Sequence, residues 1–326
     1  MKTRSFRLLA ALCSILATAG WFAWVHAQQA PHFTSIQPLT NKETRLTITA
    51  ATGRSYRIEV TTNAQDWQGF FTFPTNVATS LQHTDSAAPY LPARFYRAAQ
   101  LVGTNILSGD HLPTTNGDVV IRPIDHASFV MQWSNLWIYN DPASGSFAGI
   151  PKADLILISH THSDHFQPTV LAGVWKTNTV FVTPLAVYSS GSYGFRSNTI
   201  VLANGQATNV LGIHVEAVPA YNGNHPVGVG NGYVLTIGGK RLYMAGDTGN
   251  TPEMRALPDI DVAFLCINQP FTMTVNDATN AVRAFRPKVV YPYHYRDSTG
   301  ATTNAAAFKQ RLGTDLGIEV RLRKWY

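Results

Sequence analysis

The amino-acid sequence predicts an α/β protein in which a small all-β module precedes a larger domain of packed β-sheets covered by helices. Short strand-like runs fill the region before residue 102, and in SYRIEV the apolar residues Tyr56, Ile58 and Val60 alternate with charged ones. This period of two is typical of a strand that is buried on one face. After a Gly-, Thr-, Asn- and Pro-rich stretch, strand-like and helical segments alternate, which favours sheets with helices packed on them.

The N-terminal residues have the pattern of a secretory signal peptide. Three basic residues precede the apolar run Leu8–Val25, which is followed by an A-x-A-like ending. This predicts a signal peptide over residues 1–27 with cleavage before Gln28. An uncleaved membrane anchor is the alternative, because an apolar run of this length can span a bilayer. We therefore expect a secreted or periplasmic protein with no membrane attachment after cleavage.

Cysteine content and charge limit the other function classes. Cys266 is the only cysteine after the signal segment, so no internal disulfide can form and the core must hold the fold. Without the basic residues of the signal, the formal net charge of +6 falls to +3. No Lys/Arg cluster alternates with aromatic residues, and the terminal RLRKWY reads as a solvated strand end. Nucleic acid is therefore not an expected partner.

Residues 28–102 are predicted to form the accessory β-sandwich domain, with strands over 45–50, 55–62, 70–73 and 94–98. The phrases GRSYRIEVTTNAQDW and ARFYRAAQ resemble accessory β-sandwich modules of secreted bacterial enzymes. Trp67 and Tyr90 could bind carbohydrate or another surface, although aromatic residues in such modules are more often part of the core. Residues 103–117 are predicted to be a linker.

Residues 118–326 are predicted to form the catalytic domain. Strand-like runs are VVIRPI, SFVMQW, LWIYN, DLILIS, KVVYPY and GIEVRLR. A helix is expected over 274–285 with Thr274 as its N-cap, because apolar residues there recur on one helical face. A second helix is expected over 303–312.

The densest group of chemically active residues follows the apolar run ADLILIS. His160, His162, Asp164 and His165 lie within HTHSDH. A loop at the end of a buried strand can direct several side chains to one point. A solvated polar loop, with Asp164 in the first turn of a helix, is the alternative. The density of metal-ligand residue types favours a metal site.

This motif resembles the signature of the metallo-β-lactamase superfamily. Three further phrases follow in the order expected of that superfamily: YNGNHP with His225, MAGDTG with Asp247, and YPYHY with His294. The phrases DHASF, YNDP and KADLILISHTHSDH are most similar to its lactonase-like branch of metal-dependent hydrolases. The resemblance implies an αββα sandwich with a one- or two-metal site at one edge.

The resemblance also implies a ligand set for two divalent ions. The first ion is expected at His160, His162 and His225, the second at Asp164, His165 and His294, with Asp247 bridging both. Zn²⁺ fits these nitrogen and oxygen ligands best, and Mn²⁺ or Fe²⁺ is the alternative. Asp247 could instead cap a helix after Thr251, and His294 could be a surface histidine.

Two further residues are expected to support the ligands from a second shell. His126 in DHASF matches a position near the site in the superfamily, although a single histidine between strands is often structural. Asp141 in YNDP could accept a hydrogen bond from a ligand imidazole, and an Asp-Pro turn is the alternative. The remaining histidines of the two domains are not expected to bind the metals: His32, His83, His111 and His214.

The predicted activity is hydrolysis of a small ester, lactone or related substrate by a metal-bound hydroxide. Asp247 would hold the ions together and Asp164 could pass a proton to the leaving group. Phosphodiesterase and β-lactamase activity are the alternatives. An iron-dependent oxidoreductase is a further class, but the diiron oxidases of the superfamily carry Glu where this sequence has His162. The expected partner is a small-molecule substrate, and the sequence leaves the oligomeric state open.

Overall fold

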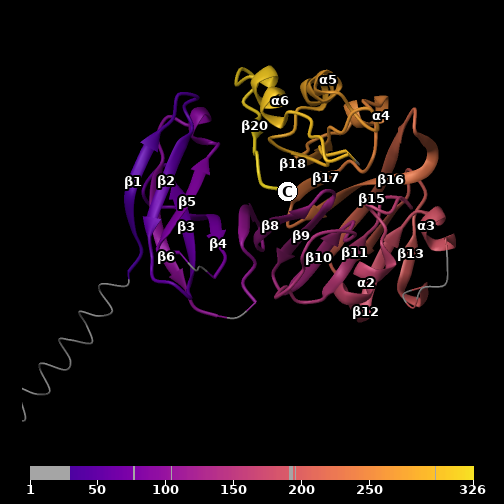
Figure 1. Ribbon diagram of the computed structural model, residues 1–326, viewed down its shortest axis with the longest axis horizontal. Coiled ribbons are helices and arrows are strands. Elements are labelled where there is room, and N and C mark those ends of the chain that lie inside the picture. The colour runs from indigo at the N-terminus through magenta and orange to yellow at the C-terminus, as the bar shows by residue number, and fades with distance from the viewer. Residues whose placement is uncertain (1–29, 76–77, 104, 191–193, 195, 298) are drawn as a thin grey trace, which may run out of the picture.

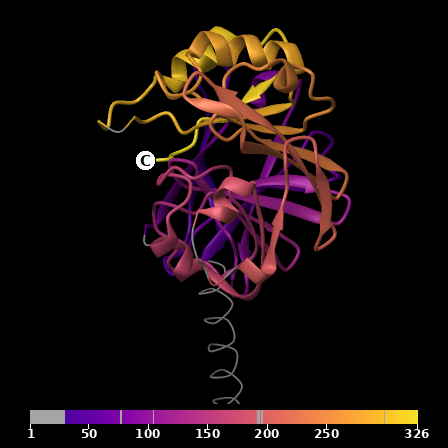
Figure 2. The same cartoon turned by 90° about the vertical axis from the view of Figure 1, so that its right-hand side faces the viewer.

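The computed structural model describes residues 30–326 except 76–77, 104, 191–193, 195 and 298, so the predicted signal segment lies outside it. The strands in this part of the chain form sheets of three, ten and seven strands. Figure 1 shows the N-terminal module in indigo beside a larger body with two stacked sheets. In Figure 2 helices cover the outer face of the upper sheet. None of the described helices is both long and apolar enough to cross a membrane.

The N-terminal module is a β-sandwich, as the sequence predicts. One layer contains β1 (His32–Pro38), β2 (Thr44–Thr49) and β5 (Ser80–Asp85), and the other contains β3 (Ser55–Thr61), β4 (Gln68–Phe73) and β6 (Phe95–Leu101). Leu46, Ile48, Tyr56 and Ile58 are fully buried between them, which accounts for the alternating pattern of β2 and β3. Tyr90 is not a free aromatic, because its hydroxyl donates to the carbonyl of Ile318.

The predicted linker over 103–117 is partly wrong. Residues Gly109–Thr114 form β7, which pairs with β4 of the module and with β8 (Gly117–Asp125) of the larger domain. One ten-stranded sheet therefore runs through both domains, in the order β13-β12-β11-β10-β9-β8-β7-β4-β3-β6. The polar residues of β7 read as a loop, but Asp110 and His111 are buried and find partners in Arg323 and Asp118. Tertiary pairing overrides the local turn signals here.

The larger domain is the predicted αββα sandwich. The rest of the ten-stranded sheet contains β9 (Ser128–Trp133), β10 (Leu136–Asn140), β11 (Ala153–Leu157), β12 (Trp175–Thr183) and β13 (Thr199–Val201). The seven-stranded sheet contains β14 (Ala207–Val210), β15 (Ile213–Asn222), β16 (His225–Ile237), β17 (Lys240–Met244), β18 (Val262–Cys266), β19 (Val289–Tyr293) and β20 (Glu319–Val320). The main core lies between the sheets, where the rings of Phe129 and Phe264 stack with centroids 4.3 Å apart.

The helices lie outside these sheets. They are α2 (Pro168–Val174), α3 (Leu185–Ser189), α4 (Pro252–Arg255), α5 (Val275–Phe285) and α6 (Ala305–Leu312), with 3₁₀ turns at Ala88–Tyr90 and Arg196–Asn198. The predicted N-cap is confirmed, because the Thr274 hydroxyl accepts from the Asp277 backbone N–H and completes a capping box.

The C-terminal segment differs from the predicted solvated strand end. Only Glu319–Val320 form a strand, and Trp325 is fully buried. Arg321 is buried beside Glu319, while Arg323 forms two hydrogen bonds with the Asp110 carboxylate. Buried arginines are tolerated when they are paired in this way. The local sequence carries no sign of these distant partners.

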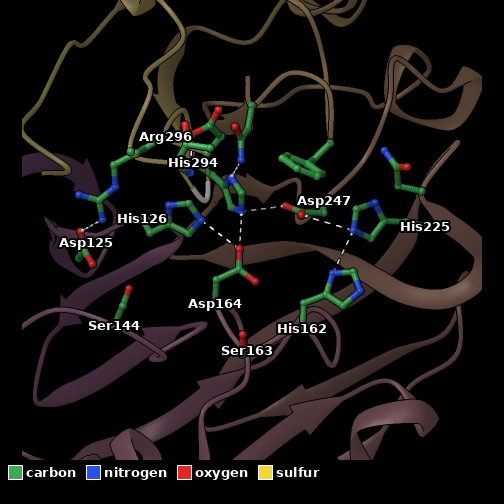
Figure 3. Close-up of a pocket in the computed structure, with 16 residues that line it drawn as sticks. Asp125, His126, Ser144, His162, Ser163, Asp164, His225, Asp247, His294 and Arg296 are labelled. Carbon is green, nitrogen blue, oxygen red and sulfur yellow. Dashed lines mark hydrogen bonds and ion pairs between the residues drawn. The ribbon is translucent and has the colours of Figure 1, made fainter.

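The two sheets bring several strand ends to one edge. Strands β10 and β11 are parallel, and β8 runs in the same direction because β9 is antiparallel to both β8 and β10. Strands β17, β18 and β19 are also parallel to one another. The carboxyl ends of these two sets lie together, and the polar loops that follow them meet there (Figure 3).

Candidate metal centre

All seven predicted ligands converge at this edge, and they form what we call the metal cluster: His160, His162, Asp164, His165, His225, Asp247 and His294. The HTHSDH residues lie in the loop between β11 and α2, and Asp247 and His294 follow β17 and β19. His225 is the first residue of β16 rather than part of a free loop. Figure 3 shows the Asp247 carboxylate between the imidazoles of His225 and His294.

Local backbone geometry helps to aim these side chains. Gly246 has φ of 61°, and a Cβ atom there would lie 3.0 Å from the Asn231 carbonyl oxygen, so the turn before Asp247 requires glycine. His126, Asp141 and His294 also have positive φ, which is uncommon for residues with a side chain. Such conformations concentrate at functional sites.

The alternative role of Asp247 as a helix cap is wrong. The N-cap of α4 is Thr251, whose hydroxyl accepts a hydrogen bond from the Met254 backbone N–H. The Asp247 side chain is instead directed among the histidines and is 5% exposed. The Asp247 carboxylate is therefore free to take part in a metal site.

One side of the metal cluster contains His160, His162 and His225. His225 Nε2 lies 3.3 Å from His162 Nδ1 and 3.4 Å from Asp247 Oδ2. His160 Nε2 lies 3.9 Å from the same Asp247 oxygen. These four donor atoms lie within 4.8 Å of one another, which is close enough to surround one ion.

The other side contains Asp164, His165 and His294. The Nε2 atoms of His165 and His294 are 2.9 Å apart, and each lies 3.3 Å from Asp247 Oδ1. Asp164 Oδ2 is 3.3 Å from His294 Nε2 and 3.9 Å from His165 Nε2. The two oxygens of Asp247 thus face different groups of imidazoles, the arrangement that a bridging carboxylate needs.

Asp141 orients the second group. Its Oδ2 atom accepts hydrogen bonds from His165 Nδ1 at 2.8 Å and from the Ser159 hydroxyl at 2.7 Å, while Oδ1 accepts from the Ser159 backbone N–H. With its Nδ1–H donated to Asp141, His165 directs its Nε2 atom towards the metal cluster. Asp141 is fully buried, so these partners fix both of its oxygens.

His126 forms a chain of hydrogen bonds that ends at Asp164. The Tyr326 hydroxyl donates to His126 Nδ1 at 2.9 Å, and His126 Nε2 donates to Asp164 Oδ2 at 3.0 Å. The Tyr326 oxygen also accepts from the backbone N–H groups of Tyr295 and Arg296. His126, Asp164 and His294 form a third group close enough for a metal. Sequence reasoning missed Tyr326, which carries no local motif.

Two asparagines complete the support and were also missed. Asn222 Oδ1 accepts from His225 Nδ1 at 2.9 Å, and the Asn268 amide lies 3.2 Å from His294 Nδ1. Asn268 follows β18 and Asn222 ends β15, so both obey the strand-end pattern that identified the ligands. The excluded histidine of the same domain, His214, contacts Asn209 instead.

The electrostatics fit bound cations. Burial, then the neighbouring His165, lowers the pKa of His160 well below its usual value and leaves this imidazole neutral, as a metal ligand must be. Burial opposes ionisation of Asp247, but His294 and His165 hold its pKa well below the usual range. Burial also opposes charge on His165, yet Asp247 and Asp141 raise its pKa strongly, so positive charge is favoured at this point.

Buried polar atoms without hydrogen-bond partners give a separate test of whether metal ions fit the site. His160 Nε2 and Asp247 Oδ1 are buried and lack hydrogen-bond partners among the described residues. Buried polar atoms are normally satisfied, and an orphaned one costs about 1–3 kcal/mol. Both atoms belong to the metal cluster, and two divalent ions would satisfy them. The residues present therefore fit the metals that the resemblance implies.

A cavity of about 820 Å³ opens directly over these residues. Asp164, His162 and His225 lie at its base, and Phe271, Ser144 and Arg296 line its walls (Figure 3). Arg296 Nη2 is 3.3 Å from Asp125, and the guanidinium stacks 4.0 Å above the Tyr326 ring. The volume is in the range of pockets for small molecules.

The layered fold and the histidine-aspartate cluster at its strand ends support a metal-dependent hydrolase of the metallo-β-lactamase fold. The sequence profile of the β-lactamase superfamily domain matches residues 120–294, so the chain belongs to this superfamily.

Individual relatives are consistent with membership of this superfamily. A UPF0173 metal-dependent hydrolase from Pelotomaculum thermopropionicum is 31% identical over 217 residues, covering 61% of this chain and 94% of the relative. A crystal structure from Parabacteroides distasonis, named as a metal-dependent hydrolase, is 39% identical with a TM-score of 0.62, covering 68% of this chain and 100% of that one. Igni18, a metallo hydrolase from Ignicoccus hospitalis, is similar in fold at 23% identity and a TM-score of 0.54, covering 63% of this chain and 95% of its own.

Proposed function

We propose that the protein is a secreted or periplasmic hydrolase that holds two divalent metal ions, most suitably Zn²⁺, and cleaves a small ester or lactone. The observation that carries this proposal is the position of Asp247, whose two oxygens face two separate groups of imidazoles. When bound, such ions would lower the pKa of water to supply a nucleophile and would polarise the substrate oxygen.

The protein side chains then have distinct tasks. Asp247 would hold both ions through its two oxygens and would neutralise part of their charge. Asp164 is the carboxylate of the metal cluster that reaches solvent, with 43% of its side chain exposed, so it can pass a proton to the leaving group. His126 holds Asp164 in place through its Nε2–H, and Asp141 holds His165.

The volume of the cavity suits a small substrate. One residue that lines it, Arg296, favours a second candidate activity. Phosphodiester cleavage is that candidate, because Arg296 lines the cavity and can interact with an anionic group. The ester or lactone proposal rests on the resemblance to the lactonase-like branch. Both candidates use the same metal cluster.

The test is metal analysis of the purified protein followed by a substrate panel. We expect about two zinc ions per chain. We also expect turnover of a nitrophenyl ester or a homoserine lactone above that of a phosphodiester and a chromogenic β-lactam. His214→Ala is the matched control and should retain metal content and rate. Tightly bound iron with oxygen-dependent turnover and no hydrolysis would refute the proposal.

The export part of the proposal has its own test. N-terminal sequencing of the protein recovered from the periplasm or culture medium should begin at Gln28. Recovery of the intact chain in the membrane fraction would instead support the anchored form.

A further inference from the structure

Tyr326 lies beside the metal cluster without belonging to it. Its hydroxyl oxygen is 2.9 Å from His126 Nδ1 and 3.1 Å from the backbone nitrogens of both Tyr295 and Arg296. The Arg296 guanidinium covers its ring, with the guanidinium carbon 4.0 Å from the ring centroid. Three hydrogen bonds and one stacking contact therefore fix the position of this hydroxyl.

The number of available protons sets the direction of each of these hydrogen bonds. Backbone N–H groups only donate, so the Tyr326 oxygen accepts from Tyr295 and Arg296. A hydroxyl group has two lone pairs and one proton, and these two bonds use both lone pairs. Burial raises the pKa of Tyr326, so the hydroxyl keeps its proton at neutral pH. His126 Nδ1 must accept that proton, which leaves the proton of the imidazole itself on Nε2.

The Nε2 proton of His126 is directed at Asp164. The distance from His126 Nε2 to Asp164 Oδ2 is 3.0 Å, and the same oxygen lies 3.3 Å from His294 Nε2. The other oxygen, Oδ1, makes no hydrogen bond or ion pair with the residues that the structure describes, and Asp164 lines the cavity. His126 therefore engages one oxygen of Asp164 and leaves the second for the leaving group.

The same proton decides whether His126 can bind a metal ion. Donor atoms of His126, Asp164 and His294 lie within 4.8 Å of one another, which is close enough to surround an ion. A metal ligand needs a lone pair, and a nitrogen that carries a proton has none to offer. The hydrogen bond from Tyr326 thus prevents a competing site at His126 and leaves Asp164 and His294 to the group that they form with His165.

Backbone contacts hold both ends of this chain of hydrogen bonds. The His126 N–H donates to the carbonyl of Trp325 at 3.3 Å, and the His294 N–H donates to the carbonyl of His126 at 3.3 Å. Trp325 is fully buried, so the residue before Tyr326 cannot shift freely. His126 has φ of 54°, an uncommon conformation that these contacts maintain.

We propose that Tyr326 is a positioning residue of the metal centre, whose hydroxyl fixes His126 in the Nε2–H tautomer so that His126 donates to Asp164 and does not bind a metal ion. Tyr326 acts only through His126 and does not line the substrate cavity. Its effect on turnover rests on the proposed hydrolase function. The position of the proton on His126 does not, and it can be measured in the metal-free protein.

The first experiment locates this proton by ¹⁵N NMR of the His126 ring in the full protein, with and without zinc. Comparison with His126→Ala assigns the signals. We expect a directly bonded proton on Nε2 and none on Nδ1 in both forms. A proton on Nδ1, or loss of the Nε2 proton when zinc is added, would overturn the proposal.

A double-mutant cycle then tests whether Tyr326 acts through His126. Zinc affinity is measured by chelator competition in Tyr326→Phe, in His126→Ala and in the combined variant. We expect a loss of about fivefold for Tyr326→Phe, which removes one hydrogen bond and keeps the ring on Arg296. We expect a loss of about 10- to 100-fold for His126→Ala. Once residue 126 is alanine, Tyr326→Phe should cause no further loss.

The control is Tyr188→Phe, the same chemical change in α3, where the tyrosine ring contacts Arg196. It should bind zinc as the parent does. Parental or tighter zinc binding in Tyr326→Phe would refute the proposal. So would losses that add fully in the combined variant, because Tyr326 would then act by another route.

Kinetics with any substrate that the parent cleaves extend the test to turnover. Tyr326→Phe should lower kcat about fivefold and change KM by less than about twofold, since Tyr326 does not line the substrate cavity. A change confined to KM would contradict a positioning role. A parent protein that cleaves none of the test substrates would count against the proposed function, and the NMR and zinc measurements would still decide the role of Tyr326.

Discussion

The cavity over the metal cluster and a cavity of about 430 Å³ between the module and the larger domain, called the interdomain cavity, share β8 as a wall but carry opposite charge. Ile121, Arg122 and Pro123 face the interdomain cavity, and Asp125 faces the metal cluster. Around the metal cluster, four carboxylates accompany a single arginine, whereas in the interdomain cavity four cations accompany a single carboxylate. The metal cluster also holds a buried nitrogen, His160 Nε2, that has no hydrogen-bond partner among the described residues.

This difference shows that one strand can border two environments of opposite charge. Burial, then the neighbouring His165, keeps the His160 imidazole neutral, so its unpartnered nitrogen can offer a lone pair to a cation. Burial, then the positive charge of Arg323, lowers the pKa of His83 to about 3, so this imidazole stays neutral inside the module.

The largest effect is expected at Asp247. Asp247→Asn keeps the size of the side chain but removes the negative charge that lies between the two groups of imidazoles. Metal content and turnover should both fall, by more than the roughly 10- to 100-fold cost of losing a supporting residue. The measurements are metal analysis and the pH–rate profile, with His214→Ala as control. If Asp247→Asn kept the metal content and turnover rate of the parent protein, the proposed role of Asp247 would be refuted.

The next effect is on stability, at the carboxylate of the interdomain cavity. Asp110→Asn leaves Arg323 without its charged partner, which should lower the free energy of unfolding by about 3–5 kcal/mol. Urea unfolding measures this change. Asp315→Asn, at an exposed position, should change stability by less than about 0.5 kcal/mol. A small effect at both positions would show that the cavity does not need this carboxylate.

The sign of the pH dependence of stability follows from the same pair, Asp110 and Arg323. Burial opposes ionisation of Asp110, but Arg323 and Arg321 hold its pKa well below the usual range. Its stabilising contribution is therefore complete above the unfolded pKa of about 3.9 and is lost as pH falls through the lower folded value. The difference between the parent and Asp110→Asn should be largest near neutral pH and shrink in acid. A difference that grows in acid would contradict this.

A smaller effect is expected at Asp141, which supports the metal cluster without facing its cavity. Asp141→Asn replaces an acceptor of the His165 and Ser159 hydrogen bonds with an amide. Metal affinity should fall about 10- to 100-fold, as for other supporting residues. Competition with a chelator measures it, and parental affinity would show that His165 is oriented without Asp141.

The metal cluster could be predicted because its residues are dense and follow buried strands. HTHSDH places four candidate ligands within six residues, and His225, Asp247 and His294 each stand in a recognisable phrase. The β-sandwich and α5 were also predictable, since alternation and capping are local signals. Local patterns survive folding when tertiary contacts agree with them.

The sequence by itself determined the layered fold, the residues that gather in the metal cluster and the chemical class, because these depend on local patterning and a compact motif. Tertiary structure alone decided that β7 joins the two domains in one sheet, that Tyr326 reaches His126, and that Arg323 pairs with Asp110. Each of these contacts joins residues far apart in the chain, and its stability comes from burying a polar group with a distant partner. No local signal encodes such a partner, so the interdomain cavity became visible only in the folded molecule.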